Sequence, residues 1–238
     1  MGIAHSVITD FTFQPGDLAE RLMMQSELII TSIAILLTFT ALILLLLHDW
    51  RISMIVLALQ YMGVFILVLS HWSLEMAAAK LIAGWISAAV IGMAISANTD
   101  NSTQPEADKS KNPDRLLDQA RSSAQSGLGL AFRILTSGLV ALTIASQMES
   151  ITGWLPDLEA MYAWGGLILI GFGLVKLGFT DQPLHILIAL LTSLAGFEIL
   201  YAALDQTVIS AGLFAAVNLA LALVGAYLLT APYMEEGA

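Results

Sequence analysis

The chain has no cysteine among its 238 residues and only four histidines. Without cysteine it cannot form a disulfide, a thiolate zinc site, an iron–sulfur cluster or a c-type haem. No apolar run carries the buried histidine pair that a bis-histidine haem needs, because the histidines fall at or beyond the ends of the runs: His5, His48, His71 and His185. We therefore expect no cofactor and no metal.

Charge is also scarce, and most of it is negative. Only 12% of the residues are charged and the net charge is −10, which argues against nucleic acid as a partner. The sequence contains no P-loop, GxGxxG or HExxH motif, so nucleotide-driven and metallopeptidase functions have no support. The chain shows no catalytic centre of its own, and any contribution to catalysis must come from a few polar groups surrounded by apolar residues.

Apolar residues are abundant instead. They make up 58% of the chain, and the mean hydropathy is +0.81. Seven runs approach the roughly 20 residues that cross a bilayer as a helix. These runs are Leu28–Leu47, Ile52–Ser70, Met76–Ala97, Leu128–Gln147, Met161–Phe179, Leu184–Leu204 and Val208–Leu229. The sequence predicts an all-α, polytopic membrane helical bundle.

The distribution of basic residues predicts the orientation, because cytoplasmic loops carry the positive excess. One side of the predicted bundle has a single basic residue, Arg21, among acids. The other side has Arg51, Lys109, Lys111, Arg115, Arg121 and Lys176. We expect the N-terminus outside, the C-terminal "APYMEEGA" in the cytoplasm, and a multi-pass protein of a prokaryotic-type inner membrane.

Polar segments divide the chain. Residues 1–27 lack the basic start of a signal peptide, and we expect an outer amphipathic segment with a short helix opened by Pro15; a disordered tail is the alternative. Residues 98–127 are rich in polar residues and predict a cytoplasmic linker between a three-helix unit, 28–97, and a four-helix unit, 128–238. Within this linker, 114–125 fit either a helix or a solvated hinge.

Glu198 is the deepest carboxylate. It lies in "LTSLAGFEILYAAL", inside a run with no other charge, and a carboxylate costs on the order of 2.5–3.5 kcal/mol there. A proton relay is one interpretation, and a structural hydrogen bond by the neutral acid is the other. Tyr201, three residues on, is expected to share its face.

Three further polar residues interrupt apolar runs. Lys80 lies about one turn inside the third run. It either snorkels to the outer headgroups or is a buried ion that pairs with Glu198, which lies at similar depth, or relays protons. Gln60 and Asn218 lie near the centres of the second and seventh runs, where each lines a hydrated path or bonds to a neighbouring helix. The candidate proton pathway is therefore Glu198, Lys80, Tyr201 and Asn218.

Small residues on the fifth and seventh runs predict close helix packing, because they let backbones approach. The fifth run contains Gly171 among several glycines, and the seventh has Gly212, Ala216 and Ala220 spaced by four. We expect leucine at Gly171 or Gly212 to impair assembly.

The last runs resemble known families. "ALLTSLAGFEILYAAL" looks like the second helix of the K-type membrane subunit of complex I and of Mrp-type antiporters, and "AGLFAAVNLALALVGAYLL" resembles its third. The length, seven runs and Lys80 are similar to E-type subunits of group 4 hydrogenases. The resemblance carries over Glu198 alone, because Phe214 stands where the K-type pattern has a second acid, and the 98–127 linker is long for the E type.

This resemblance implies a membrane-arm subunit of a complex-I-like (NADH-quinone oxidoreductase-like), hydrogenase-like or antiporter-like assembly, contributing to proton or sodium translocation. Its partners would be antiporter-like and quinone- or hydrogenase-module chains, besides the lipid bilayer. The alternatives are a non-catalytic scaffold or assembly subunit of an energy-transducing complex, and a stand-alone transporter. The last has less support, because no internal repeat pairs the first three runs with the last.

Overall fold

The computed structural model describes residues 15–47, 49–101, 114–154 and 159–235. Every regular element in these ranges is an α-helix. The helices are α1 (Pro15–Leu46), α2 (Trp50–Val68), α3 (Leu74–Asn101), α4 (Asp114–Trp154), α5 (Ala160–Gly178), α6 (Pro183–Leu204) and α7 (Val208–Glu235).

All seven helices are long and apolar enough to cross a membrane. The outward faces agree with this, since large apolar side chains stay exposed on the bundle surface: Ile55 is 69% exposed, Leu135 69% and Ile209 83%. A soluble protein rarely shows such a continuous apolar surface. The prediction of an all-α polytopic membrane bundle is confirmed, and the orientation of its termini stays a prediction.

Parts of the two polar segments, 1–27 and 98–127, are helical and continue directly into membrane-spanning helices. The short N-terminal helix expected at Pro15 is not a separate element, because α1 runs unbroken from Pro15 to Leu46. On the other side, α4 begins at Asp114, so the helical alternative for 114–125 is the one observed. The rest of the N-terminal segment (1–14) and the middle of the linker (102–113) lie outside the described residues.

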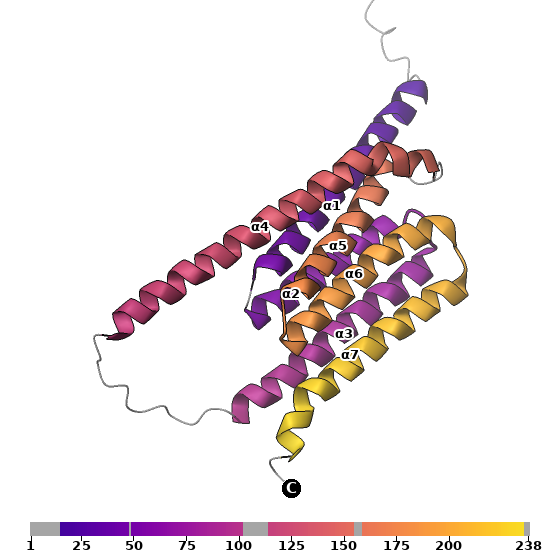
Figure 1. Ribbon diagram of the computed structural model, residues 1–238. Helices are drawn as coiled ribbons and strands as arrows, with labels where there is room; N and C mark the ends of the chain where they lie inside the picture. The colour runs from indigo at the N-terminus through magenta and orange to yellow at the C-terminus, as the bar shows by residue number, and fades with distance from the viewer. Residues whose placement is uncertain (1–14, 48, 102–113, 155–158, 236–238) are drawn as a thin grey trace, which may run out of the picture.

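The helices form one bundle, in which α6 lies between α5 and α7 (Figure 1). Helix α6 packs against α2, α5 and α7, and 56% of its most apolar 18-residue stretch is buried. Helix α3 packs along α7, and α1 packs on α2 and α5. Helix α4 lies across the outside of α1 and α5, and only 6% of its most apolar 18-residue stretch is buried. The interior of the bundle is therefore built around α6.

Glycines set the closest approaches in this bundle. A Cβ added at Gly166 of α5 would lie 2.7 Å from Leu200 Cγ of α6, so no larger residue fits between these helices. Gly171 packs on α4, where an added Cβ would lie 2.7 Å from Val140 Cγ1. Gly212 of α7 has no atom within 4 Å of such a Cβ. Close packing within the chain is therefore observed at Gly171 and not at Gly212, which faces outward; the effect of either substitution on assembly stays a prediction.

Hydrogen bonds tie the helix ends together. The Trp72 indole donates to the Asp205 carbonyl at 3.0 Å, which joins the α2–α3 connection to the α6–α7 connection. At the other end, the Asp49 side chain caps α2 by accepting from the Arg51 N–H at 3.1 Å. The first bond links the neighbouring ends of α2, α3, α6 and α7, and the second stabilises only the start of α2.

Candidate functional site

Lys80 lies inside the bundle. It comes six residues after the start of α3 at Leu74, about 9 Å along the helix axis, and it is 2% exposed. The small neighbours Ala77 and Ala83 on the same helix are buried too, so adjacent helices pack close around the lysine stem. The lysine does not snorkel to the headgroups, which was one of the two interpretations.

The ammonium group of Lys80 forms an ion pair and a hydrogen bond with Glu198 Oε1 of α6. Glu198 is fully buried and comes six residues before the end of α6 at Leu204, so both charges lie at about the same depth. The second interpretation of Lys80, a buried ion paired with Glu198, is thus the observed contact.

Tyr61 of α2 joins the pair to α7. Its ring lies 5.8 Å from Lys80 Nζ, within the range of a cation–π contact. Its hydroxyl donates to Asn218 Oδ1 of α7 at 3.4 Å. Gly84, one turn after Lys80, makes room for the ring, because an added Cβ would lie 2.6 Å from Tyr61 Cδ1. Four helices therefore meet in one buried polar cluster.

Tyr61 and Gly84 were not singled out from the sequence. A tyrosine in an apolar run is expected as ordinary core or interface material. Its neighbour Gln60, a polar amide near the middle of the same run, was the only local signal. Gly84 gives no sign by itself that a ring lies against it.

Several atoms near this cluster lack a partner among the described residues. They include Glu198 Oε2 and Asn218 Nδ2, and all belong to buried side chains. The same holds for both amide atoms of Gln60 and for the hydroxyls of Ser53 and Thr192. Buried polar atoms in proteins are generally satisfied by protein or by ordered water.

These polar groups are spread along the bundle. Ser53 and Gln60 are seven residues apart on α2, two turns of one face, and Thr192 precedes Glu198 by six residues on α6. From the ion pair, buried polar side chains thus continue toward the α1–α2 end of the molecule. Together with water, such groups can form a chain of hydrogen bonds along which a proton moves. An apolar core contains no such groups.

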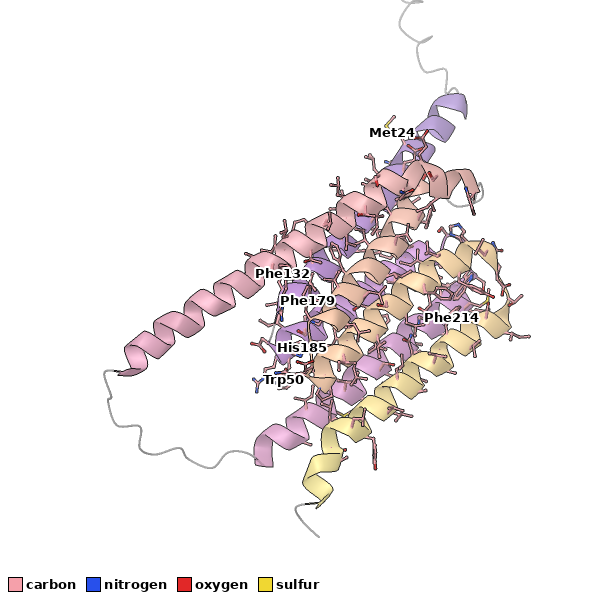
Figure 2. All side chains as sticks on the ribbon, in the orientation of Figure 1. Met24, Trp50, Phe132, Phe179, His185 and Phe214 are labelled. Atoms are coloured by element: carbon pink, nitrogen blue, oxygen red, sulfur yellow. The ribbon has the colours of Figure 1, made fainter. Side chains whose placement is uncertain are left out.

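Tyr201 does not bond to Glu198. Its hydroxyl donates to Asp205 Oδ2 at 3.3 Å, at the end of α6. Its ring contacts Phe214 of α7 edge-on, with centroids 5.2 Å apart, and Phe197 stacks nearby. Figure 2 shows Phe214 on α7, far from His185 at the opposite end of α6. The structure therefore brings Lys80, Glu198 and Asn218 together, while Tyr201 belongs to an aromatic group beside them.

Two groups at this end, outside the spans, have shifted pKa values. The hydrogen bond from the Thr207 hydroxyl lowers the pKa of the exposed Asp205 carboxyl. Burial lowers the pKa of His71, against the opposing effect of Glu159. Asp205 thus stays ionised as the acceptor for Thr207 and Tyr201, and His71 favours its neutral form.

The fold and the buried pair define the class: a polytopic α-helical membrane protein with an ion pair inside the membrane. The chain matches no family model, no curated protein and no solved structure. The resemblance to complex I and hydrogenase subunits remains a prediction from the residues.

Proposed function

We propose that this protein is a membrane-embedded subunit that moves protons through the Lys80–Glu198 pair, within a complex-I-like, hydrogenase-like or antiporter-like assembly. The observation that carries the proposal is the ion pair itself, buried among four helices. Ionisable side chains inside a membrane are costly, and they are typical of proton and ion pathways. The resemblance of the last three helices to a K-type subunit supports the same function.

The pair offers a simple way to couple proton uptake and release. A proton that binds to the Glu198 carboxylate neutralises it and leaves the Lys80 ammonium without its counter-ion. A buried charge that loses its partner costs several kcal/mol, so the lysine is driven to release a proton from Nζ. Uptake at one side chain thereby favours release at the other.

The surroundings provide places for a proton to go. Glu198 Oε2 and Asn218 Nδ2 remain available for water, and the Tyr61 hydroxyl already bonds to Asn218 Oδ1. Gln60 lies next to Tyr61 on α2. These groups support transfer between the pair and the bundle interior.

The geometry favours protons over sodium. Lys80 Nζ occupies the position beside Glu198 Oε1 where a bound cation would need to sit. A proton needs only the two side chains that are present.

The proposal includes partners and a location. A single pair near one side of the membrane does not make a complete path, so the remaining steps are assigned to antiporter-like and quinone- or hydrogenase-module chains. We place the assembly in a prokaryotic-type inner membrane, with the N-terminus outside, because of the bias in basic residues. Mass spectrometry of chains that co-purify in mild detergent tests this part, and recovery of the protein alone would favour a stand-alone transporter.

The test of the mechanism compares Glu198→Gln with Glu198→Asp. Glutamine keeps the size and a hydrogen bond but cannot titrate, whereas aspartate titrates with a shorter reach. We expect proton pumping by membrane vesicles, at equal amounts of assembled complex, to fall at least tenfold in Glu198→Gln and less in Glu198→Asp. A general acid–base group typically contributes that much or more.

Glu75→Gln is the matched control. Glu75 is an exposed carboxylate in the first turn of α3, at the same end of the bundle as the pair. Its removal changes the charge by the same amount and should leave pumping unchanged. Wild-type pumping by Glu198→Gln would reject the proton role and favour a scaffold, in which the contact between Lys80 and residue 198 only holds α3 and α6 together.

A further inference from the structure

Two of the buried hydroxyl groups differ from the others in the bonds that they form. Within the described residues, most buried serine and threonine side chains donate to a carbonyl three or four residues earlier in the chain: Thr40, Ser87, Ser137 and Ser210. This bond satisfies a hydroxyl inside an apolar helix. Ser53 of α2 and Thr192 of α6, which are 0% and 2% exposed, have no partner among the described residues. Their oxygens are therefore available to a ligand between the helices.

A buried amide accompanies these hydroxyls. Gln60 of α2 is 1% exposed, and neither its Oε1 nor its Nε2 has a partner among the described residues. It comes seven residues after Ser53, two turns along the same face of the helix. Burial of an amide without any hydrogen bond is costly, so an amide at this position favours a polar ligand beside it.

These polar groups follow the ion pair at short intervals along the bundle. The indole–carbonyl bond between the α2–α3 and α6–α7 connections places the ends of α2 and α6 at one level, so depths on both helices are counted from there. At about 1.5 Å per residue, Glu198 lies about 9 Å before the end of α6 and Thr192 about 18 Å. Gln60 lies about 12 Å before the end of α2 and Ser53 about 23 Å. With increasing depth the groups alternate between two helices that pack together, in steps of about 3–6 Å.

The opposite side of the ion pair is different. Between the pair and the α2–α3 end, the buried side chains are mainly apolar: Val64, Leu67, Ala77, Ile199, Ala202 and Ala211. Among the described residues, every buried side chain with an unpartnered polar atom lies level with the pair or farther from this end. In Figure 2 this end is the one near Phe214, and Trp50, at the start of α2, marks the other. The pair is thus closer to one end, while its polar surroundings extend toward the other.

We propose that a chain of waters between α2 and α6 connects Glu198 Oε2 with the α1–α2 end of the bundle. Its protein ligands are Gln60, Thr192 and Ser53, and Ala195, on α6 before Glu198, leaves space beside them. One water bridges polar groups about 5–6 Å apart, because each hydrogen bond spans about 2.8 Å. This inference rests on the proposed proton function. It makes the three ligands positioning residues, through which the pair exchanges protons with the more distant end.

Solid-state NMR of the full-length protein in lipid bilayers tests the hydration, by transfer of magnetisation from water to alanine methyl groups. Ala195 and Ala189 are a matched pair, because both are on α6 and both are 0% exposed. Ala189 lies on the side of α6 that packs tightly on Gly173 of α5. We expect transfer to Ala195 and not to Ala189. No transfer to Ala195, or equal transfer to both methyl groups, would overturn the proposal.

Substitutions at Thr192 test whether protons use these waters. Thr192→Val keeps the shape of the side chain but removes the hydroxyl. We expect proton pumping by membrane vesicles, at equal amounts of assembled complex, to fall about tenfold, the effect of one lost hydrogen bond on a rate. Thr192→Ser keeps the hydroxyl and should retain most of the pumping. A purely structural role of the threonine would give the opposite order, because valine fills its space better than serine.

Thr40→Val is the matched control, because Thr40 is also 2% exposed but its hydroxyl donates to the Leu37 carbonyl. It should pump like the wild type. Equal pumping by Thr192→Val and Thr40→Val, together with a loss in Glu198→Gln, would overturn the water route and leave the proton role of the pair intact. Wild-type pumping by Glu198→Gln would reject the proposed function, and this inference with it.

Discussion

Lys80 and Glu198 depend on each other energetically because neither is in contact with bulk water. Removal of one partner from a buried pair typically costs about 3–5 kcal/mol, since the other charge is left uncompensated, whereas replacement of both by apolar residues is often neutral. The cluster with Tyr61 and Asn218 adds a cation–π contact and a hydrogen bond to this pair. The pair is therefore a coupled unit, both in stability and in the proposed proton transfer.

A double-mutant cycle tests the coupling. We expect Lys80→Met and Glu198→Leu each to reduce the free energy of unfolding by about 3–5 kcal/mol, and the combined variant to recover most of that loss. The measurement is reversible unfolding in mixed micelles. The combined variant should assemble yet fail to pump. Additive losses of stability would show that the two side chains do not interact in the folded protein.

His71 gives an expectation for pH dependence. Its pKa is lowered by burial from the usual 6.5, so on acidification the unfolded chain takes up a proton first. The stabilisation from the neutral imidazole is complete above pH 6.5 and is lost as the pH falls toward the lowered value. We expect the Tm to decrease between pH 7.5 and 5.5 by less in His71→Gln than in the wild type. An equal decrease in both would exclude His71 as a contributor.

The sequence predicted candidate site residues where a charged side chain interrupts an apolar run. Glu198 and Lys80 met that condition, and their similar depths made a contact possible. The contact itself was not predictable, because the two residues are 118 positions apart and their distance depends on how the helices pack. Tyr61 was missed since its ring is compatible with any core position.

At the scale of elements, the apolar runs predicted all seven helices, but not all of their ends. Hydropathy identifies the stretches of the chain that are apolar enough to lie in a membrane. A helix can continue beyond such a stretch into polar sequence. For this reason α1 begins at Pro15 and α4 extends from Asp114 to Trp154. The same limitation applies to glycines, because sequence spacing does not reveal whether a small residue faces a neighbour or lipid.

Gly166 and Gly212 provide a test of this distinction. We expect Gly166→Leu to reduce stability by more than about 3 kcal/mol or to prevent folding, because a Cβ already meets Leu200 and overpacking alone costs about 1–3 kcal/mol. Gly212→Leu should be tolerated, because nothing lies within 4 Å of its Cβ position. The yield of monodisperse protein by size-exclusion chromatography reports both. Equal loss in the two variants would contradict the observed packing.

At the scale of the whole molecule, the segments before and after the linker are interleaved. Helix α1 packs on α5, α3 packs on α7, and α2 contacts α6 (Figure 1). The segments 28–97 and 128–238 are therefore separated by the linker in the sequence but share one interior in the folded protein. Sequence could not predict this, because each apolar run is equally able to pack against any other.

The orientation of this bundle remains to be measured, and the absence of cysteine makes that straightforward. We expect a single cysteine at Ser110 to be protected from an impermeant thiol reagent in intact cells and to react after the cells are opened. A cysteine at Ser150, near the opposite end of α4, should react in intact cells. Labelling of Ser110→Cys in intact cells would reverse the assignment of both termini and of the linker.

The distance in sequence between Lys80 and Glu198 also has a consequence for biosynthesis. The lysine is translated 118 residues before its partner, which at 5–20 residues per second is roughly 6–24 s. Throughout that interval the Lys80 ammonium of α3 lacks its carboxylate partner, because Glu198 of α6 has not yet been made. A chain that stops before Glu198 never gains this counter-ion, so we expect its α3 to be less stable in the membrane than in the complete bundle.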